Sequence, residues 1–185
     1  MSVILLKLPK DKKGYNPFPG IGGILIGPAI RDFLVGIPPN RFDYYFHPRT
    51  KTDEWNRTVK YITRDLGFVK KEAEYGSRQL SFVGNEGIIT IQKHTSNTYY
   101  AEALVPNVMF TIDQFAGRGP DILTTKEALK DLKMGRVLVT KWWEKNFGRN
   151  TKGITDALKL LEAKGFVFDE QHFAYMMAKK SPYGI

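Results

Sequence analysis

The sequence predicts an α+β fold, in which helices flank a small mixed sheet and a short helical tail follows. Three observations predict this class. A helix, a proline-rich turn and an aromatic strand follow one another within residues 25–46. Two strand-like segments around an Asn-Glu-Gly turn indicate a hairpin over residues 79–93. Amphipathic helical patterns lie before and after this hairpin, at 52–66 and 151–164.

Size and composition are those of a globular protein built around one main domain. The chain has 185 residues, of which 42% are apolar and 13% aromatic, enough to bury a core. Residues 1–140 are expected to form this domain, and residues 141–185 a helical extension packed on it. The sequence has no cysteine, which excludes disulfides, thiol catalysis and cysteine-based zinc sites.

The chain is basic, because 28 lysines and arginines outnumber 19 aspartates and glutamates to give a formal net charge of +9. Such an excess favours a polyanionic partner, most often nucleic acid, and the alternative is a basic surface that only confers solubility. The apolar run at residues 3–6 is too short for a signal-peptide core or a membrane span, and it predicts a first strand. We therefore expect a cytoplasmic protein without a membrane partner.

Residues 14–46 supply the helix, turn and strand around which the rest of the chain is organised. Glycines and prolines make residues 14–23 a loop. Pro28 suits the first position of a helix, and Gly36 can end that helix in the left-handed conformation. Two prolines then make a rigid turn over residues 37–40. Residues 41–46, Arg-Phe-Asp-Tyr-Tyr-Phe, follow as a strand.

The helix expected over residues 52–66 has two contrasting faces. Its apolar side chains recur at helical spacing, at Trp55, Val59, Ile62 and Leu66. The other side carries a basic stripe, which consists of Arg57, Lys60 and Arg64. Such a stripe is either a solvated face or a contact surface for RNA or DNA.

In the second half of the chain, residues 124–127 read Thr-Thr-Lys-Glu, a capping box that opens a helix ended by Gly135. The further elements that the pattern predicts are a short strand at 136–140 and helices at 151–164 and 169–180.

Several of these segments, taken in order, resemble the head domain of the poly(A) polymerase and tRNA CCA-adding nucleotidyltransferases. Gly27 matches the family's first glycine, Arg31 and Asp32 match its Arg-Asp pair, and Gly36 matches its loop glycine. Pro28 replaces the family's second glycine. The resemblance implies a nucleotidyltransferase-like fold in which Gly27, Arg31 and Asp32 lie at a nucleotide site. It also implies that Asp43 belongs to a metal-binding carboxylate pair.

The resemblance covers about residues 22–168. Phe110-Thr111-Ile112 matches a strand motif of the family, which implies a strand here, and residues 127–132 match the core of the helix that follows it. Two sets of charged residues in the family's motifs have no counterpart in this sequence. Asn107, Val108 and Met109 stand where the family has Arg-Arg-Asp. The candidates for a third carboxylate on the strand at 87–93 and just beyond it are Thr90, Gln92 and His94, and none is acidic.

The largest departure lies in the strand at 41–46. The family's Asp-x-Asp pair holds metal ions because residues two apart on a strand point to the same face. Here the pair reads Arg41-Phe42-Asp43, so only Asp43 keeps its carboxylate. Arg41 is expected on the same face, where it would repel a dication by roughly 8 kcal/mol at ~4 Å and an effective dielectric constant of ~20. We therefore do not expect two-metal catalysis.

Trp142 and Trp143 are adjacent, and one face of a helix or strand cannot bury both. One of them is a candidate stacking platform for a base or an anchor for a protein partner, and the alternative is that both pack between the sheet and the C-terminal helices. His47, His94 and His172 are far apart with no carboxylate at ligand spacing, so we expect no metal site on them.

These patterns favour a catalytically degenerate nucleotidyltransferase-fold protein that acts as a basic scaffold or binding subunit, with a protein assembly or nucleic acid as partner. Stand-alone heads of this size resemble those encoded by phages, which adds virion assembly, and a virion location, as expectations. Two alternatives stay open. One is an active enzyme that transfers NMP from NTP to an RNA end or another acceptor and uses Asp43 to bind Mg²⁺. The other is a non-catalytic RNA- or DNA-binding module. No cofactor is expected unless the protein is active.

Overall fold

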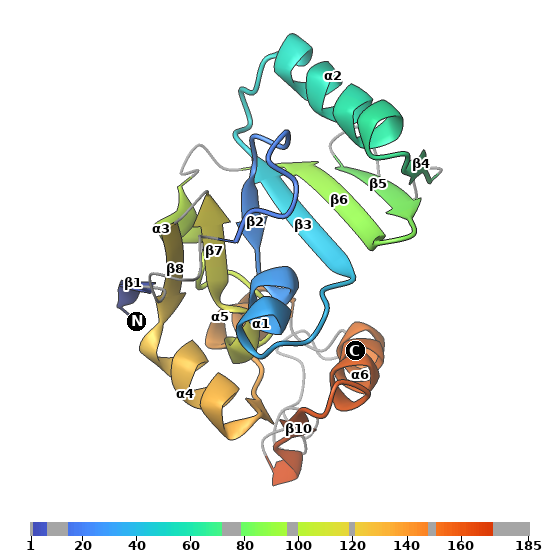
Figure 1. Ribbon diagram of the computed structural model, residues 1–185. Helices are drawn as coiled ribbons and strands as arrows, with labels where there is room; N and C mark the ends of the chain where they lie inside the picture. The colour runs from blue at the N-terminus through green and yellow to red at the C-terminus, as the bar shows by residue number, and fades with distance from the viewer. Residues whose placement is uncertain are drawn as a thin grey trace, which may run out of the picture.

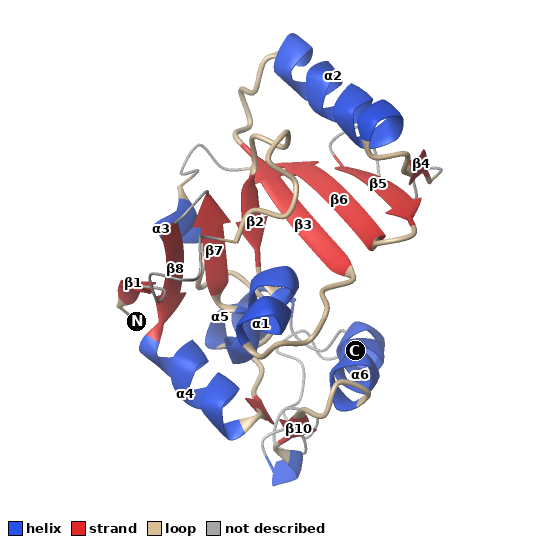
Figure 2. Ribbon diagram, in the orientation of Figure 1, coloured by secondary structure: helices blue, strands red, loops and turns tan. Residues whose placement is uncertain are grey.

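The computed structural model describes residues 2–6, 15–71, 79–95, 100–118, 121–147 and 151–171, and one large sheet lies at its centre (Figures 1 and 2). The strands of this sheet are β1 (Val3–Leu6), β2 (Ile24–Ile26), β3 (Arg41–Phe46), β4 (Val69–Lys70), β5 (Gln79–Gly84), β6 (Gly87–Lys93), β7 (Phe115–Arg118) and β8 (Asp121–Thr125). They run in the order β1-β8-β7-β2-β3-β6-β5-β4. β3 and β6 pair in parallel, whereas β2 pairs antiparallel with both β3 and β7. The predicted mixed sheet is confirmed, although it has eight strands and is larger than expected.

Helices pack around this sheet, as the α+β prediction requires (Figure 2). They are α1 (Pro28–Leu34), α2 (Thr52–Lys60), α3 (Ala101–Leu104), α4 (Lys126–Met134), α5 (Lys141–Phe147) and α6 (Thr151–Glu162). A π-helical turn, Tyr61–Asp65, extends α2, and a 3₁₀ turn, Thr111–Asp113, precedes β7. β9 (Arg136–Val137) and β10 (Val167–Phe168) form a separate parallel pair.

The alternation of side chains along β3 separates the two faces of the sheet. Phe42, Tyr44 and Phe46 are buried in the main hydrophobic core, to which α1 and α2 contribute Ile30 and Trp55. In Figure 1, α1 lies in front of the sheet on this side. Arg41, Asp43 and Tyr45 point to the opposite face, which we call the site face.

Two smaller cores complete the packing. The first lies on the site face, and its buried residues come from β2, β7 and the segment of α3: Ile24, Ile26, Leu104, Val105 and Ala116. The second joins the 3₁₀ turn to β9 and α6 through Phe110, Ile112, Val137, Val139, Ile154, Leu158, Leu161 and Phe166. Helix α6 is therefore packed against the segment that leads into β7.

The two ends of α1 are marked by residues that the sequence singled out. Pro28 is the first residue of the helix, and Gly36 follows its end with a φ of 76°, as predicted. Gly27 also has a positive φ, 66°, and a Cβ there would lie 3.3 Å from the carbonyl oxygen of Asp113. A glycine at position 27 therefore lets the 3₁₀ turn approach the N-terminus of α1 closely.

The hairpin predicted over residues 79–93 is confirmed, with Asn85 and Glu86 between its strands. Gly87 is the first residue of β6 and has a φ of 122°. A Cβ on Gly87 would overlap the carbonyl oxygen of Asn40, which accepts a hydrogen bond from the backbone N–H of Ile88 at 2.9 Å. The close approach of β3 thus requires a glycine at this position.

The strand implied for Phe110-Thr111-Ile112 was wrong. Phe110 makes one isolated β-bridge with Val139, and the chain then turns as a 3₁₀ helix. The turn is closed by the N–H of Asp113, which donates to Phe110 at 3.1 Å, and by the hydroxyl of Thr111, which donates to Asp131 at 2.6 Å. A buried carboxylate on α4 therefore holds the segment in a turn rather than a strand.

Other expectations were correct in part. The helix at 52–66 continues beyond Lys60 as the π-helical turn, and the strand at 136–140 shrinks to β9 plus the bridge at Val139. The helix at 151–164 is confirmed as α6, whereas the helix predicted for 169–180 falls largely outside the described residues. β2, β7 and β8 were not predicted. No helix in the described ranges is long and apolar enough to span a membrane.

Candidate functional site

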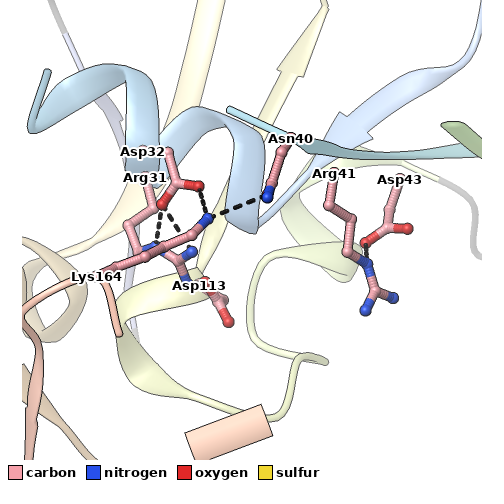
Figure 3. Close-up of polar contacts among 7 residues, drawn as sticks. All are labelled: Arg31, Asp32, Asn40, Arg41, Asp43, Asp113 and Lys164. Atoms are coloured by element: carbon pink, nitrogen blue, oxygen red, sulfur yellow. Dashed lines mark hydrogen bonds and ion pairs between the residues drawn. The ribbon is translucent and has the colours of Figure 1, made fainter. Parts of the chain in front are cut away.

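Arg41 and Asp43 form an ion pair on the site face (Figure 3). Arg41 Nε donates to Asp43 Oδ2 at 2.8 Å, and the nearby carboxylate raises the pKa of Arg41. In register, Asp43 lies opposite Thr90 of β6 and Ile26 of β2. Neither strand beside Asp43 therefore offers a second carboxylate at this level of the sheet.

The other carboxylate oxygen of Asp43, Oδ1, does not take part in the ion pair with Arg41. Oδ1 is buried, and it accepts no hydrogen bond from any residue in the described part of the chain. The side chain of Asp43 is 15% exposed, whereas that of Arg41 is 59% exposed. A ligand that contacts this pair therefore reaches the guanidinium of Arg41 more easily than the carboxylate.

The resemblance to the nucleotidyltransferase family implies a divalent metal ion at this position, but the residues present do not fit one. A two-metal centre needs several carboxylate oxygens, and Asp43 is a single carboxylate with one oxygen already bonded to a cation. Among the described residues, no group of three histidines, aspartates or glutamates is placed to hold a metal ion. We therefore derive no chemical step through a metal here.

Arg31 and Asp32 lie in a second, buried cluster beside the first (Figure 3). Arg31 Nη1 donates to Asp113 Oδ1 at 2.6 Å, and Arg31 Nε donates to Asp32 Oδ1 at 2.8 Å. Lys164, in the turn after α6, donates to the other oxygen of Asp32 and, at 3.3 Å, to Asn40. The two cations and two carboxylates of this cluster balance one another.

Packing closes the cluster from solvent. The side chains of Arg31 and Asp32 are only 3% and 1% exposed, and the guanidinium of Arg31 lies 5.2 Å from the centre of the Phe166 ring. Burial raises the pKa of Asp113, and the positive charge of Arg31 offsets this only in part. Arg31 and Asp32 are thus engaged by the chain itself, and Lys164 and Phe166 cover them.

A cavity of about 250 Å³ lies on the site face. Its lining comes from β2, β3, β6, α5 and the segment around α3: Ile26, Tyr45, Gln92, His94, Thr95, Leu104, Asn107, Val108 and Trp142. Tyr45 lies two residues beyond Asp43 on the same face of β3. The rings of Tyr45 and His94 are inclined to each other, with their centres 6.2 Å apart.

The two adjacent tryptophans have different surroundings. Trp142 lines the cavity, whereas Trp143 packs against the hydrophobic core that joins the 3₁₀ turn to α6. Their ring centres are 6.4 Å apart. One face of α5 does not bury both, as expected, and the structure brings only Trp142 to the site face.

The basic stripe lies elsewhere. Arg57, Lys60 and Arg64 are exposed on α2 and its π-helical extension. α2 packs on the main core through Trp55, on the side of the sheet opposite the site face (Figure 1). The structure therefore does not bring the stripe together with Asp43 or with the cavity.

Sequence reasoning missed several residues of these sites. Tyr45 could have been found, because it continues the alternation of Arg41 and Asp43 along one strand. Gln92 was considered only as a position where the family could have its third carboxylate. Lys164 and Phe166 carry no local signal, since they reach Arg31 and Asp32 from more than 130 residues away in the chain.

The fold and the arrangement on the site face define a class, the proteins with a nucleotidyltransferase-like fold. A solved structure described as a CCA-adding enzyme in complex with ATP aligns with a TM-score of 0.61 and 17% identity, over 86% of this chain and 40% of the other. A tRNA-processing enzyme in an apo form aligns with a TM-score of 0.59 and 16% identity, over 89% and 48%. A CCA-adding enzyme of Thermotoga maritima complexed with tRNA gives 0.58 and 17%, over 88% and 42%.

At these identities the likeness establishes the fold alone. The chain spans less than half the length of each of these three proteins. No protein-family model and no curated protein matches the sequence. The nucleotidyltransferase-like fold expected from the sequence is thus confirmed.

Proposed function

We propose that this chain is a nucleotidyltransferase-fold protein that does not transfer nucleotides and instead acts as a basic binding subunit with nucleic acid as its partner. The observation that carries the proposal is the ion pair between Arg41 and Asp43 on the site face. It occupies the place where the resemblance implies a pair of metal-binding carboxylates. A guanidinium stands in for one of the two acids.

The chemistry of nucleotidyl transfer explains why this replacement matters. Divalent ions bridge the attacking hydroxyl and the triphosphate, and carboxylates hold those ions. Arg41 removes one carboxylate, adds a positive charge and bonds one oxygen of the other carboxylate. Thr90, which faces Asp43 from β6, contributes no negative charge.

Three observations support nucleic acid as the partner. The chain has a formal net charge of +9. Proteins of the same fold include a CCA-adding enzyme complexed with tRNA and a tRNA nucleotidyltransferase complexed with a primer tRNA and an ATP analogue. The exposed stripe on α2 (Arg57, Lys60 and Arg64) offers three cations on one side of a helix, which suits a phosphate backbone.

Labelled NTPs, incubated with RNA acceptors in Mg²⁺ or Mn²⁺, test the loss of catalysis. We expect no incorporation by the wild-type protein. Incorporation that disappears in the Asp43→Ala variant would overturn the proposal, because it would assign catalysis to this carboxylate. Incorporation that persists unchanged in Asp43→Ala would indicate a contaminating enzyme.

A salt titration tests the binding role. Binding of RNA or DNA is expected to weaken steeply as salt increases, because each phosphate contact releases counterions. A protein that instead forms a stable complex with another protein, such as a virion component, and holds nucleic acid only weakly would contradict this part of the proposal.

Active nucleotidyl transfer is the second candidate, and one observation favours it. Oδ1 of Asp43 is buried and has no hydrogen-bond donor among the described residues, so one carboxylate oxygen remains for a ligand. In that case Arg41, which is largely exposed, would have to leave Asp43. The Asp43→Ala comparison above separates this candidate from the first.

A further inference from the structure

We propose that two copies of this chain associate through β1, by pairing their β1 strands antiparallel across the edge of the large sheet. The interaction surface is the open side of β1 (Val3–Leu6), and the partner is a second copy of the same chain. This inference is independent of the nucleic-acid-binding function proposed above.

β1 is one of the two end strands of the large sheet. It pairs with β8 on one side, from Val3 opposite Thr125 to Leu6 opposite Ile122, and no strand of the described residues pairs with its other side. Figure 1 shows β1 at the outer margin of the sheet, beyond β8. On an edge strand, every second residue turns its backbone N–H and C=O away from the only neighbouring strand. β1 therefore offers backbone donors and acceptors to a further strand.

The two ends of the sheet differ in how well they are protected against such pairing. β4, at the other end, has only two residues, and one of them, Lys70, is charged. Short length and an edge lysine are devices that keep edge strands from pairing. β1 has four residues, all of them apolar, and its register with β8 runs without a bulge. β1 therefore lacks the protection that β4 has.

The side chains of β1 are anchored on both faces of the sheet but are not fully covered. Val3 packs against the smaller core of the site face, and Leu6 packs against the main core on the other face. Leu5 shares the face of Val3, and it is 53% exposed. A second strand beside β1 would cover Leu5, and the burial of apolar surface favours association.

The strand is complementary to itself, which is why we assign a second copy as the partner. A two-fold axis perpendicular to the sheet makes two copies of β1 antiparallel and places the same faces of the two sheets side by side. Directly opposite residues then share a face, as antiparallel pairing requires, when the axis passes beside Ile4 or Leu5. With the axis at Ile4, Leu5 of each copy lies opposite Val3 of the other. About four hydrogen bonds join the copies, and the cross-strand pairs within Val3–Leu6 are all apolar.

The charge of the chain predicts how this association depends on salt. The formal net charge is +9, so two copies repel each other, although β1 itself carries no charged side chain. Such a short interface gives a weak dimer, with a Kd of about 10–300 µM. Added salt screens the repulsion between the copies and should lower this Kd, whereas added salt weakens nucleic-acid binding. The sign of the salt effect therefore separates self-association from the proposed function.

Sedimentation equilibrium of the full chain, freed of nucleic acid, tests the proposal between about 5 µM and about 500 µM at low and at high salt. We expect monomer at the lowest concentration, a growing share of dimer as the concentration rises, and a lower Kd at high salt. A chain that stays monomeric over this range overturns the proposal and leaves the open edge to a strand of a different protein. A dimer that weakens as salt rises also overturns it, because charged groups would then hold the copies together.

Two matched variants test which edge of the sheet is used. Leu5→Lys places a lysine on the open edge, as β4 has one, and should weaken the dimer at least about 10-fold. Val69→Lys is the control, because Val69 is 72% exposed on β4 and the change adds the same charge at the opposite end of the sheet. The control should dimerise like the wild type. Equal weakening in both variants, or no weakening in Leu5→Lys, overturns the pairing through β1.

Cysteine cross-linking tests the pairing directly and does not depend on Leu5→Lys. The wild-type chain has no cysteine, so Ile4→Cys and Leu5→Cys each introduce a single thiol. The two-fold pairing brings one of these thiols opposite its own copy, with Cα atoms about 4.5–5.5 Å apart, which suits a disulfide. Oxidation by diamide should therefore link one of the two variants into a covalent dimer and should leave Val69→Cys unlinked. Cross-linking of Val69→Cys alone, or of no variant where the wild type is dimeric, overturns the proposal.

Discussion

Replacing Arg41 with aspartate is expected to create a divalent-metal site on β3. The change places two carboxylates two residues apart on the site face, in the arrangement that holds metal ions on strands. It also releases Oδ2 of Asp43, which Arg41 Nε contacts at 2.8 Å in the wild-type protein. Oδ1 of Asp43 already lacks a partner among the described residues.

The expected change in Mn²⁺ affinity follows from the charge at position 41. A guanidinium about 4 Å from a dication repels it by about 2 kcal/mol at the dielectric constant of water, and by about 8 kcal/mol at an effective value of 20. Arg41 is 59% exposed, so the lower figure applies. Arg41→Ala should therefore raise Mn²⁺ affinity about 30-fold, and Arg41→Asp about 1,000-fold, because the new carboxylate adds an attraction of similar size.

Electron paramagnetic resonance of free Mn²⁺ measures these affinities directly. Arg57→Asp is the matched control, because it makes the same change of charge on α2, on the opposite side of the sheet from Asp43. It should bind Mn²⁺ no more tightly than the wild type. Adding Asp43→Asn to Arg41→Asp should abolish the gain. A wild-type chain that binds Mn²⁺ as tightly as Arg41→Asp would refute the reasoning.

Three further predictions concern stability and binding. Burial raises the pKa of Asp113, so the folded protein holds the proton of this carboxyl group more tightly than the unfolded chain does. The stability that the protonated Asp113 contributes should be full below about pH 4 and should be lost as the pH rises through the raised pKa. Urea unfolding at several pH values measures this dependence of stability on pH, and Asp113→Asn should remove it. Gly87→Ala should lower the free energy of unfolding by more than about 3 kcal/mol, because the new Cβ would overlap the backbone of Asn40. Gly36→Ala is the control: there is open space around its Cβ, so it should lower the free energy of unfolding by only about 1–2 kcal/mol in the same urea experiment. Replacing the three cations of the basic stripe with alanine should reduce the slope of log K for single-stranded RNA binding against log salt concentration by about 2. An unchanged slope would show that the stripe does not contact the RNA.

Several parts of the fold could be predicted because their signals are local. Pro28 and Gly36 mark the ends of α1 through the φ angles that they prefer. A threonine caps α4 as predicted, but the cap is Thr125 rather than Thr124, the first residue of the predicted capping box; the hydroxyl of Thr125 accepts the N–H of Ala128 at 3.0 Å. The placement of Arg41 and Asp43 on one face follows from the two-residue period of a strand.

Other parts could not be predicted, because their signals are not local. β2 has only three residues and follows a glycine-rich loop, and it is a strand because β3 and β7 pair with it on both sides. The motif at Phe110 matches a strand of the family, yet the carboxylate of Asp131 holds Thr111 in a turn. In both cases tertiary contacts outweigh the local preference.

The sequence alone determined which charges share this face of β3: the alternation along residues 41–46 puts a guanidinium and a single carboxylate on the same face, whatever surrounds them. Only the tertiary structure decided what surrounds them. Lys164 reaches Asp32, and Trp142 lines the same cavity as Tyr45 and Gln92, because β-strands and helices far apart in the chain pack on one sheet. Side-chain direction along a strand is a property of the backbone, whereas a cavity or a buried ion cluster depends on contacts between distant segments, which no local pattern records.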